Sequence, residues 1–260
     1  MTEITIDLIK KLRNQTGVSI MQCKKALQES GGDLEKAKIT LTKKSGEIAA
    51  KKEGRDLKAG IIIAKYNIIL ELACETDFVA NNNEYKNLAN NVIDIILEND
   101  LKINNVKNDE KILDILSKAI QKFGERIEVV RFDKFNNNTA SYIHINNSVG
   151  AIIEFSDKIN ESLGRDIAMH ITAQKPKYLK KENIDSLEIE KAKDTLKEEV
   201  KDKPENMQEK ILEGKLNAYF KERVLLTQTF IKDSSKTIEK LLSENNVGII
   251  RFVRYGVGEE

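Results

Sequence analysis

Residues 73–83, with the sequence ACETDFVANNN, place an aromatic side chain next to a carboxylate at a corner of the chain. An apolar run over residues 61–73 predicts strands before this corner, and an amphipathic pattern predicts a helix after it. Corners run over protein surfaces, where a bare Phe is costly unless something covers it. Thr76, Asp77, Phe78 and Val79 therefore allow two interpretations. Either Phe78 folds back onto its own core while Asp77 caps the turn, or Phe78 and Asp77 are displayed for a partner.

Few other residues could carry chemistry. The chain has two histidines, His144 and His170, and two cysteines, Cys23 and Cys74, that lie far apart in sequence. It contains no glycine-rich phosphate cradle and no nucleophile motif, and its few Cys and His residues do not predict a zinc site. We therefore expect no metal, no cofactor and no chemical catalysis. His144 alternates with apolar residues in a predicted strand and should be half exposed, whereas His170, in the apolar helix IAMHI, should be buried.

The charge balance restricts the partners. The 260 residues include 43 basic and 42 acidic side chains, for a net charge of +1. No basic excess draws the chain as a whole to nucleic acid or to a membrane surface. No window approaches 18 consecutive apolar residues, and the N-terminal residues lack the apolar core of a signal peptide. Together with the two distant cysteines, this predicts a cytoplasmic protein without a disulfide framework.

Residues 1–44 predict a small module of three helices. Ser19 and Asp33 are expected to cap the second and third helices, and Leu8, Ile9 and Leu12 share one face of the first. So few residues bury little surface, which favours a docking module over an independent enzyme domain. Ile20 and Met21 lie in the first turn of the second helix, either in the core or as exposed contacts. Residues 45–58 are expected to form a basic linker.

The central part of the chain predicts an α+β core. Residues 61–64 and 68–73 predict a β-hairpin, residues 84–96 and 111–123 predict helices, and residues 127–135, 139–146 and 149–155 predict strands. Asn81 and Glu84 are expected to form a capping box at the helix that follows the corner.

An internal repeat bears on the two interpretations of Phe78. IILELA at 68–73 resembles AIIEFS at 151–156, and an apolar helix follows each. Seventeen positions separate Glu71 from Leu88, whereas nine separate Glu154 from Leu163, so the first copy is eight residues longer. The extra residues fall where Asp77 and Phe78 lie. This addition to one copy favours a displayed Phe78.

Residues 186–224 are highly charged and predict a projecting antiparallel hairpin of two helices. Their apolar seam is thin, and Pro204 predicts the start of the second helix. Residues 225–260 return to the core with a short helix around 238–242 and a last strand over 249–255.

The chain closely resembles the elongation factor Ts family, the bacterial guanine-nucleotide exchange factors of elongation factor Tu. The resemblance covers essentially the whole chain and is most specific in five segments: TGVSIMQCKKAL at 16–27, SGEIAAKKEGR at 45–55, CETDFVA at 74–80, IAMHITAQKP at 167–176 and SKTIEKLL at 235–242. It implies an N-terminal domain of the ubiquitin-associated type (UBA-like) at 1–44. It also implies a core of two related α+β halves, at 59–136 and at 137–185 with 225–260, and an inserted coiled-coil hairpin at 186–224.

The resemblance also implies roles for single residues. Asp77 and Phe78, flanked by Thr76 and Val79, match the segment that intrudes near the Mg²⁺ and phosphate site of elongation factor Tu. Further residues match other contacts with this partner: Leu12, Ile20 and Met21 near the N-terminal docking turn, His144 facing the G domain, and Phe230 with Ile231 at a C-terminal contact. The implied partner is elongation factor Tu, both GDP-bound and nucleotide-free.

Two departures and two open points accompany the resemblance. Thr229 stands where the family often has proline, and the sequence ends at Glu260 without the terminal helix of longer relatives. We therefore expect a less rigid C-terminal contact and no contact from such a helix. The sequence does not decide whether the hairpin dimerises, so a homodimer of the complex stays open. It also leaves open a helical adapter that binds a partner through residues 1–44 alone.

Overall fold

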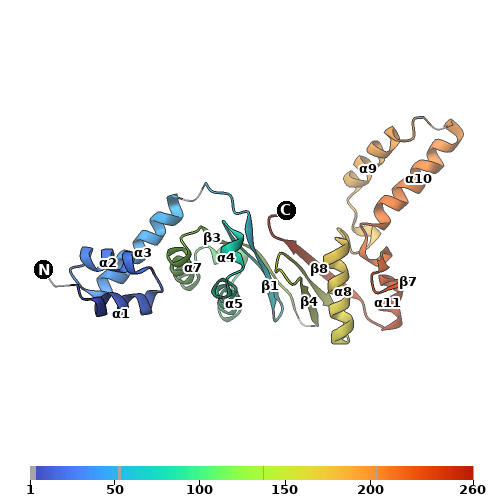
Figure 1. Cartoon of the computed structure of the whole chain (residues 1–260). Coiled ribbons are helices and arrows are strands. Elements are labelled where there is room, and N and C mark those ends of the chain that lie inside the picture. The colour runs from blue at the N-terminus through green and yellow to red at the C-terminus, as the bar shows by residue number, and fades with distance from the viewer. Residues whose placement is uncertain (1–3, 52–53, 137, 203, 260) are drawn as a thin grey trace. The chain divides into compact units, whose positions relative to one another are not determined.

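The computed structural model describes residues 4–51, 54–136, 138–202 and 204–259 (Figure 1). The chain forms two compact units. Unit 1 comprises the described residues of Met1–Lys134, Ile145–Ser148 and Tyr255–Glu260, and unit 2 comprises those of Phe135–His144 and Val149–Arg254. Helices and small antiparallel sheets are mixed in the chain, which confirms the predicted α+β class.

Three helices form the N-terminal part of unit 1: α1 (Ile6–Thr16), α2 (Ile20–Glu29) and α3 (Leu34–Lys51). The Ser19 hydroxyl accepts a hydrogen bond from the Gln22 amide, and the Asp33 carboxylate accepts from the amides that open α3, so both predicted caps are confirmed. The three helices enclose a small core of their own, made of Ile9, Leu12, Val18, Cys23, Ala26, Leu27, Ala37 and Leu41.

The third helix is longer than expected. It continues to Lys51, so the first seven residues of the predicted linker 45–58 are helical. The residues after 44 include Ala49 and Ala50, strong helix formers that extend a helix already nucleated upstream. Residues 45–51 of the predicted linker are therefore part of α3, and Lys52 and Glu53 lie outside the described residues.

A three-stranded sheet of order β1-β2-β3 is the centre of unit 1. Its strands are β1 (Ala59–Lys65), β2 (Ile68–Cys74) and β3 (Ile127–Lys134), and both neighbouring pairs are antiparallel. The helices of this part are α4 (Asp77–Ala80), α5 (Asn83–Glu98), α6 (Ile103–Val106) and α7 (Glu110–Phe123). The predicted hairpin is confirmed, and apolar residues of α5 and α7 pack with the strands in one core.

The capping box predicted at Asn81 and Glu84 is wrong. Asn82 caps α5, because its side-chain oxygen accepts a hydrogen bond from the Glu84 amide at 2.8 Å. Asn81 instead ends the short helix α4, since its own amide donates to the Asp77 carbonyl. The short helix α4, which was not predicted, moves the N-cap of α5 one residue later, to Asn82.

Unit 2 contains a second three-stranded sheet, with the order β4-β5-β8. Its strands are β4 (Thr139–Ile143), β5 (Val149–Phe155) and β8 (Ile249–Gly256), the last of which ends in residues assigned to unit 1. Helix α8 (Glu161–Gln174) contacts β4 and β5. The remaining elements are η1 (Lys181–Asn183), η2 (Leu225–Thr227), β6 (Thr229–Phe230), β7 (Asp233–Thr237) and α11 (Ile238–Glu244).

Strand β4 is shorter than the predicted strand 139–146. It ends at Ile143, because the asparagines that follow form a turn. The side chain of Asn146 accepts hydrogen bonds from the amide and hydroxyl of Ser148, and Asn147 adopts a φ of +57°. Asparagine tolerates both features better than most residues.

Two further helices of unit 2 form the predicted hairpin: α9 (Ser186–Glu198) and α10 (Glu205–Lys221) (Figure 1). Ala192, Val200, Leu212 and Phe220 are buried along this region, and the remaining surface is largely charged. Pro204 precedes α10 as its N-cap residue, which agrees with the predicted helix start. The seam is thin, as the sequence indicated.

The repeat is visible in both sheets. β2 and β5 are the central strands, and each contains a buried glutamate that pairs with an arginine of a neighbouring strand. In unit 1, Arg131 Nε lies 2.7 Å from Glu71 Oε2, and the guanidinium lies 4.4 Å from the ring centre of Tyr255. In unit 2, Arg251 Nε lies 3.2 Å from Glu154 Oε2, and the guanidinium lies 3.9 Å from the ring centre of Phe135.

Candidate partner-binding site

The corner between β2 and α5 displays an aromatic side chain. Thr76 caps the single turn α4, since its hydroxyl accepts a hydrogen bond from the Val79 amide at 3.5 Å. Val79 and Ala80 point into the core of unit 1, whereas Asp77 is exposed and Phe78 is 86% exposed. The interpretation of Phe78 as a core staple is therefore wrong, as is that of Asp77 as the cap. A helix this short fits only two inward side chains, so the other two face solvent.

Cys74, the last residue of β2, is buried and forms a hydrogen bond with the corner. The Cys74 thiol donates a hydrogen bond to the Thr76 carbonyl at 3.2 Å. Burial raises the pKa of Cys74 to about 11, so the thiol stays protonated and able to donate at neutral pH. Cys74 thus acts as a structural donor beneath the displayed turn.

The first turn of α2 presents a second apolar surface. Met21 is 81% exposed, and Ile20 is also exposed, so both belong to the surface rather than to the N-terminal core. Leu12 is completely buried in that core, so a direct contact between Leu12 and a partner is not supported. Leu12 instead supports the turn that carries Ile20 and Met21.

His144 follows the end of β4 and is exposed, not half exposed as expected. Its amide donates to the Val149 carbonyl at 2.9 Å, and its Nδ1 lies 3.2 Å from the Tyr142 hydroxyl. The next residue, Ile145, was not predicted as a contact, yet its side chain is 90% exposed in the turn before β5. The pair Asn146-Asn147 was the available signal, since it marks a turn that leaves Ile145 without a strand neighbour.

The C-terminal pair is divided between core and surface. Phe230 is buried in the core of unit 2, so a direct Phe230 contact is not supported, whereas Ile231 is partly exposed. The Ile231 amide donates to His170 Nδ1 at 3.3 Å, which leaves His170 Nε2 as the donor to Gln228 Oε1 at 2.9 Å. Burial lowers the pKa of His170, so the imidazole is neutral and structural, as predicted.

Thr229 lies in the short strand β6, which pairs with β7, and Thr229 itself is opposite Thr237. Strand pairing therefore constrains the backbone at the position where the family often has proline. The predicted loss of rigidity from Thr229 is reduced by this pairing.

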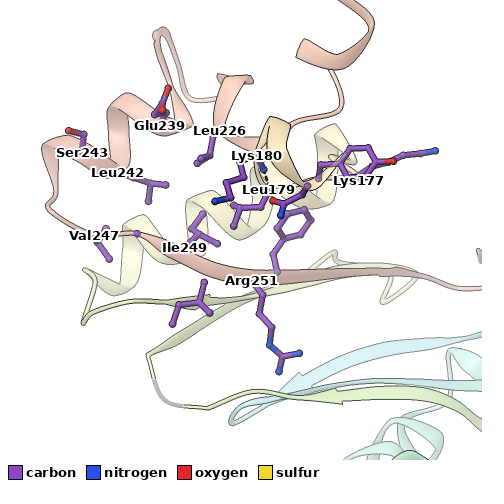
Figure 2. Close-up of a pocket in the computed structure, with 15 residues that line it drawn as sticks. Lys177, Leu179, Lys180, Leu226, Glu239, Leu242, Ser243, Val247, Ile249 and Arg251 are labelled. Carbon is purple, nitrogen blue, oxygen red and sulfur yellow. Dashed lines mark hydrogen bonds between the residues drawn. The ribbon is translucent and has the colours of Figure 1, made fainter. Parts of the chain in front are cut away.

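Unit 2 also contains open hollows. One of about 710 Å³ lies between α11, the segment around η1, and β8 (Figure 2). Figure 2 shows Leu242, Val247 and Ile249 facing this hollow, whereas Arg251 extends from β8 in a different direction. A second hollow includes Gln228, Phe230 and Ile231 among its lining residues. None of the other predicted contact residues lines either hollow.

The described residues contain no group of three or more His, Cys, Asp and Glu side chains that could hold a metal ion. Within the same residues, no helix is both long enough and apolar enough to cross a membrane.

Comparison with known proteins extends these observations to a family. The model of the family described as Elongation factor TS matches residues 75–259. This range includes the displayed turn α4 and every described residue of unit 2. Relatives named Elongation factor Ts match almost the whole chain. That of Hydrogenobaculum sp. (strain Y04AAS1) is 39% identical over 98% of this chain and 99% of its own.

Two further relatives agree. That of Prosthecochloris aestuarii is 38% identical over 99% of this chain and 100% of its own. That of Aquifex aeolicus is 36% identical over 98% of both chains. These matches include the N-terminal helices that the family model does not cover. The chain belongs to the elongation factor Ts family.

Proposed function

We propose that this protein is the guanine-nucleotide exchange factor of elongation factor Tu and acts in the cytoplasm. It binds the GDP-bound partner, promotes release of GDP by disturbing the Mg²⁺ and phosphate site, and leaves the nucleotide-free partner ready for GTP. The observation that carries this proposal is the exposed pair Asp77 and Phe78 on α4, within the segment that matches the family.

Linkage between the two binding reactions explains the mechanism. A protein that binds the nucleotide-free partner more tightly must weaken nucleotide binding by the same factor. Backbone amides hold the phosphates of a bound nucleotide, and Mg²⁺ requires near-octahedral oxygen ligands. An aromatic wedge that shifts a helix beside that site disturbs both sets of contacts. Phe78 supplies the wedge, and Asp77 supplies a negative charge close to the cation and its ligands.

Magnitudes limit the contribution of Phe78. Burial of one Phe supplies roughly 1.5–3 kcal/mol, and each tenfold change in rate needs about 1.4 kcal/mol. Phe78 alone therefore accounts for about one to two decades of acceleration. Any larger effect must come from the rest of the interface.

We propose that the remaining contacts come from three surfaces. The helical module of α1 to α3, taken as UBA-like, docks through Ile20 and Met21. His144 and Ile231 contribute contacts from unit 2. The hairpin α9–α10, taken as a coiled coil, projects from the body and is not required for exchange.

An adapter that acts through residues 1–44 alone is less well supported. The family model matches residues 75–259, which lie entirely outside that module. The displayed Phe78 also lies outside it. An adapter would require neither feature.

Release of fluorescent GDP from elongation factor Tu tests the proposal. Phe78→Ala should slow exchange by about one to two decades and should change the free energy of unfolding by less than about 0.5 kcal/mol, because the side chain has no core contacts to lose. Asp77→Ala should slow exchange from the Mg²⁺-loaded partner, and the difference should shrink when Mg²⁺ is chelated.

Tyr66 offers a matched control, because it is another exposed aromatic residue in unit 1. It lies in the β1–β2 turn with a φ of +56°, which asparagine also adopts, so Tyr66→Asn should leave both stability and exchange unchanged. A destabilised Phe78→Ala with normal exchange per folded molecule would contradict the proposal.

A further inference from the structure

A carboxylate far along the chain holds the displayed corner. Glu125 follows Gly124, which ends α7 with a φ of +69°. Glu125 Oε2 accepts hydrogen bonds from the amides of Glu75 at 3.1 Å and Thr76 at 3.0 Å. Glu125 Oε1 accepts from the Thr76 hydroxyl at 2.6 Å. One side chain therefore receives three hydrogen bonds from the two residues that precede α4.

The connection also runs in the opposite direction. Glu75 Oε1 accepts a hydrogen bond from the Arg126 amide at 2.7 Å, and Glu75 Oε2 pairs with Arg55 Nη1 at 2.8 Å. Arg126 Nη1 in turn donates to the Arg55 carbonyl at 2.9 Å. Residues 75–76 and 125–126 thus hold each other through reciprocal charge-assisted bonds, which are stronger than neutral ones. We call this set of contacts the corner clamp.

The Thr76 hydroxyl passes the constraint on to α4. Its single proton is donated to Glu125, so its lone pair is available to accept from the Val79 amide. The hydroxyl therefore has one orientation that satisfies both bonds. It joins Glu125 to the first turn of the helix that carries Phe78.

The short helix needs such outside support. A helix of four residues cannot be stable by itself, because the cost of nucleation is not recovered within one turn. Val79 and Ala80 anchor its inner side in the core. Phe78, which is almost fully exposed, contributes no anchoring contact, so its direction depends on the backbone that the clamp fixes.

We propose that Glu125 is a positioning residue for nucleotide exchange, which acts by holding α4 in the orientation that presents Phe78 and Asp77. This inference rests on the proposed exchange function. Glu125 itself need not touch the partner. Its role is to keep the wedge in place before binding, so that the partner does not have to select a rare orientation of a mobile turn.

The expected fall in exchange rate follows from the fraction of molecules in which α4 has the orientation that the partner requires. If loss of the clamp lowers the population of the competent orientation to between one third and one tenth, the maximal exchange rate falls by about threefold to tenfold. Docking through α2 is unaffected. The concentration of this protein that gives half-maximal exchange should therefore change less than the maximal rate.

The experiment measures GDP release from elongation factor Tu over a range of concentrations of the full-length protein. Glu125→Ala removes all three bonds and should give the full loss of maximal rate. Glu125→Gln keeps an acceptor for the two amides and should give a smaller loss. Asp114→Ala is the matched control, because Asp114 is an exposed carboxylate on α7 that pairs with Lys118, and neither residue belongs to the corner clamp. It should leave the maximal rate unchanged.

A double variant separates positioning from general stability. In the Phe78→Ala background, Glu125→Ala should cause a smaller further loss of maximal rate, because only Asp77 remains of the two side chains that Glu125 orients. Circular dichroism measures the folded fraction of each variant, and rates are compared per folded molecule.

If Glu125→Ala and Glu125→Gln exchange normally while Phe78→Ala is slow, the positioning role is overturned and the proposed function stands. Equal losses from Glu125→Ala with and without Phe78 also overturn it. Normal exchange by Phe78→Ala would instead overturn the proposed function.

Discussion

The strand-to-helix corners of the two sheets differ although their frameworks are alike. In unit 2, β5 ends at Phe155, and Asn160 caps α8 directly. In unit 1, β2 ends at Cys74, and the extra turn α4 precedes α5. The additional residues bring an exposed aromatic and a clamp from Glu125, whereas the described residues of the shorter corner offer only Asp157 as an exposed carboxylate. The comparison teaches that an exposed aromatic turn can be added to one copy of a repeat without changing the sheet that supports it.

The shared framework has its own difference. Both central strands bury a glutamate that pairs with an arginine, but the side chain of Arg131 is 27% exposed whereas that of Arg251 is 42% exposed. Arg131 also donates to the carbonyls of Gly256 and Glu259, and Glu71 accepts from the Gly258 amide. Glu71 therefore pairs with the more buried of the two arginines.

The largest expected effect comes from breaking these two pairs. Glu71→Ala should lower the free energy of unfolding by about 3 kcal/mol or more, because it leaves a partly buried guanidinium without its carboxylate. Glu154→Ala should cost about half as much, since water screens the more exposed Arg251. Urea unfolding of both variants measures the difference. A Glu154→Ala variant that costs as much as Glu71→Ala would show that the two networks are energetically equivalent.

A smaller effect distinguishes the helices that follow the two central strands. α8 buries His170, whereas the buried residues of α5 include no histidine. The pKa of His170 is lowered in the folded protein, so below the unfolded value of 6.5 the unfolded chain binds more protons. Stability should therefore be fully present above about pH 6.5 and should decrease as the pH falls below it.

Protonation would also convert His170 Nδ1 from an acceptor into a donor that faces the Ile231 amide. This single proton limits the slope to about 1.4 kcal/mol per pH unit. Melting temperatures of the wild type and of His170→Gln between pH 8 and pH 5 test the assignment, because the variant should show a flatter dependence. Equal slopes would place the acid sensitivity elsewhere.

The smallest effect concerns reactivity, not stability. Cys74 supports the longer corner, whereas Ser156 follows β5 in the shorter one. A thiol pKa raised from 9.0 to about 11 lowers the thiolate fraction at pH 8 roughly a hundredfold, before any effect of steric burial. Iodoacetamide should therefore label Cys74 slowly in the folded protein and quickly in urea. Rapid labelling under native conditions would mean that the corner opens often, which would weaken the case for a rigidly presented Phe78.

The sequence by itself determined most local elements, the repeat and the family. The hairpin of β1 and β2, helices α7 and α11 and the caps at Ser19 and Asp33 follow from periodicity and from side chains within a few residues of the backbone groups that they satisfy. The greater length of the first corner is also a local property, and it correctly favoured a displayed Phe78.

Only the tertiary structure decided which apolar side chains are available to a partner. Phe78 and Phe230 are both aromatic residues in short elements, yet Phe78 is exposed and Phe230 is buried. The ring of Phe230 lies beside that of His170, which precedes it by 60 positions in the chain. Leu12 and Met21 likewise differ because the helices α1 to α3 close around the first and leave the second outside. The bonds from Glu125 to Thr76 span 49 residues, and no spacing rule within the sequence brings these two together. Burial and clamping depend on what distant segments cover, and that information is carried by the fold.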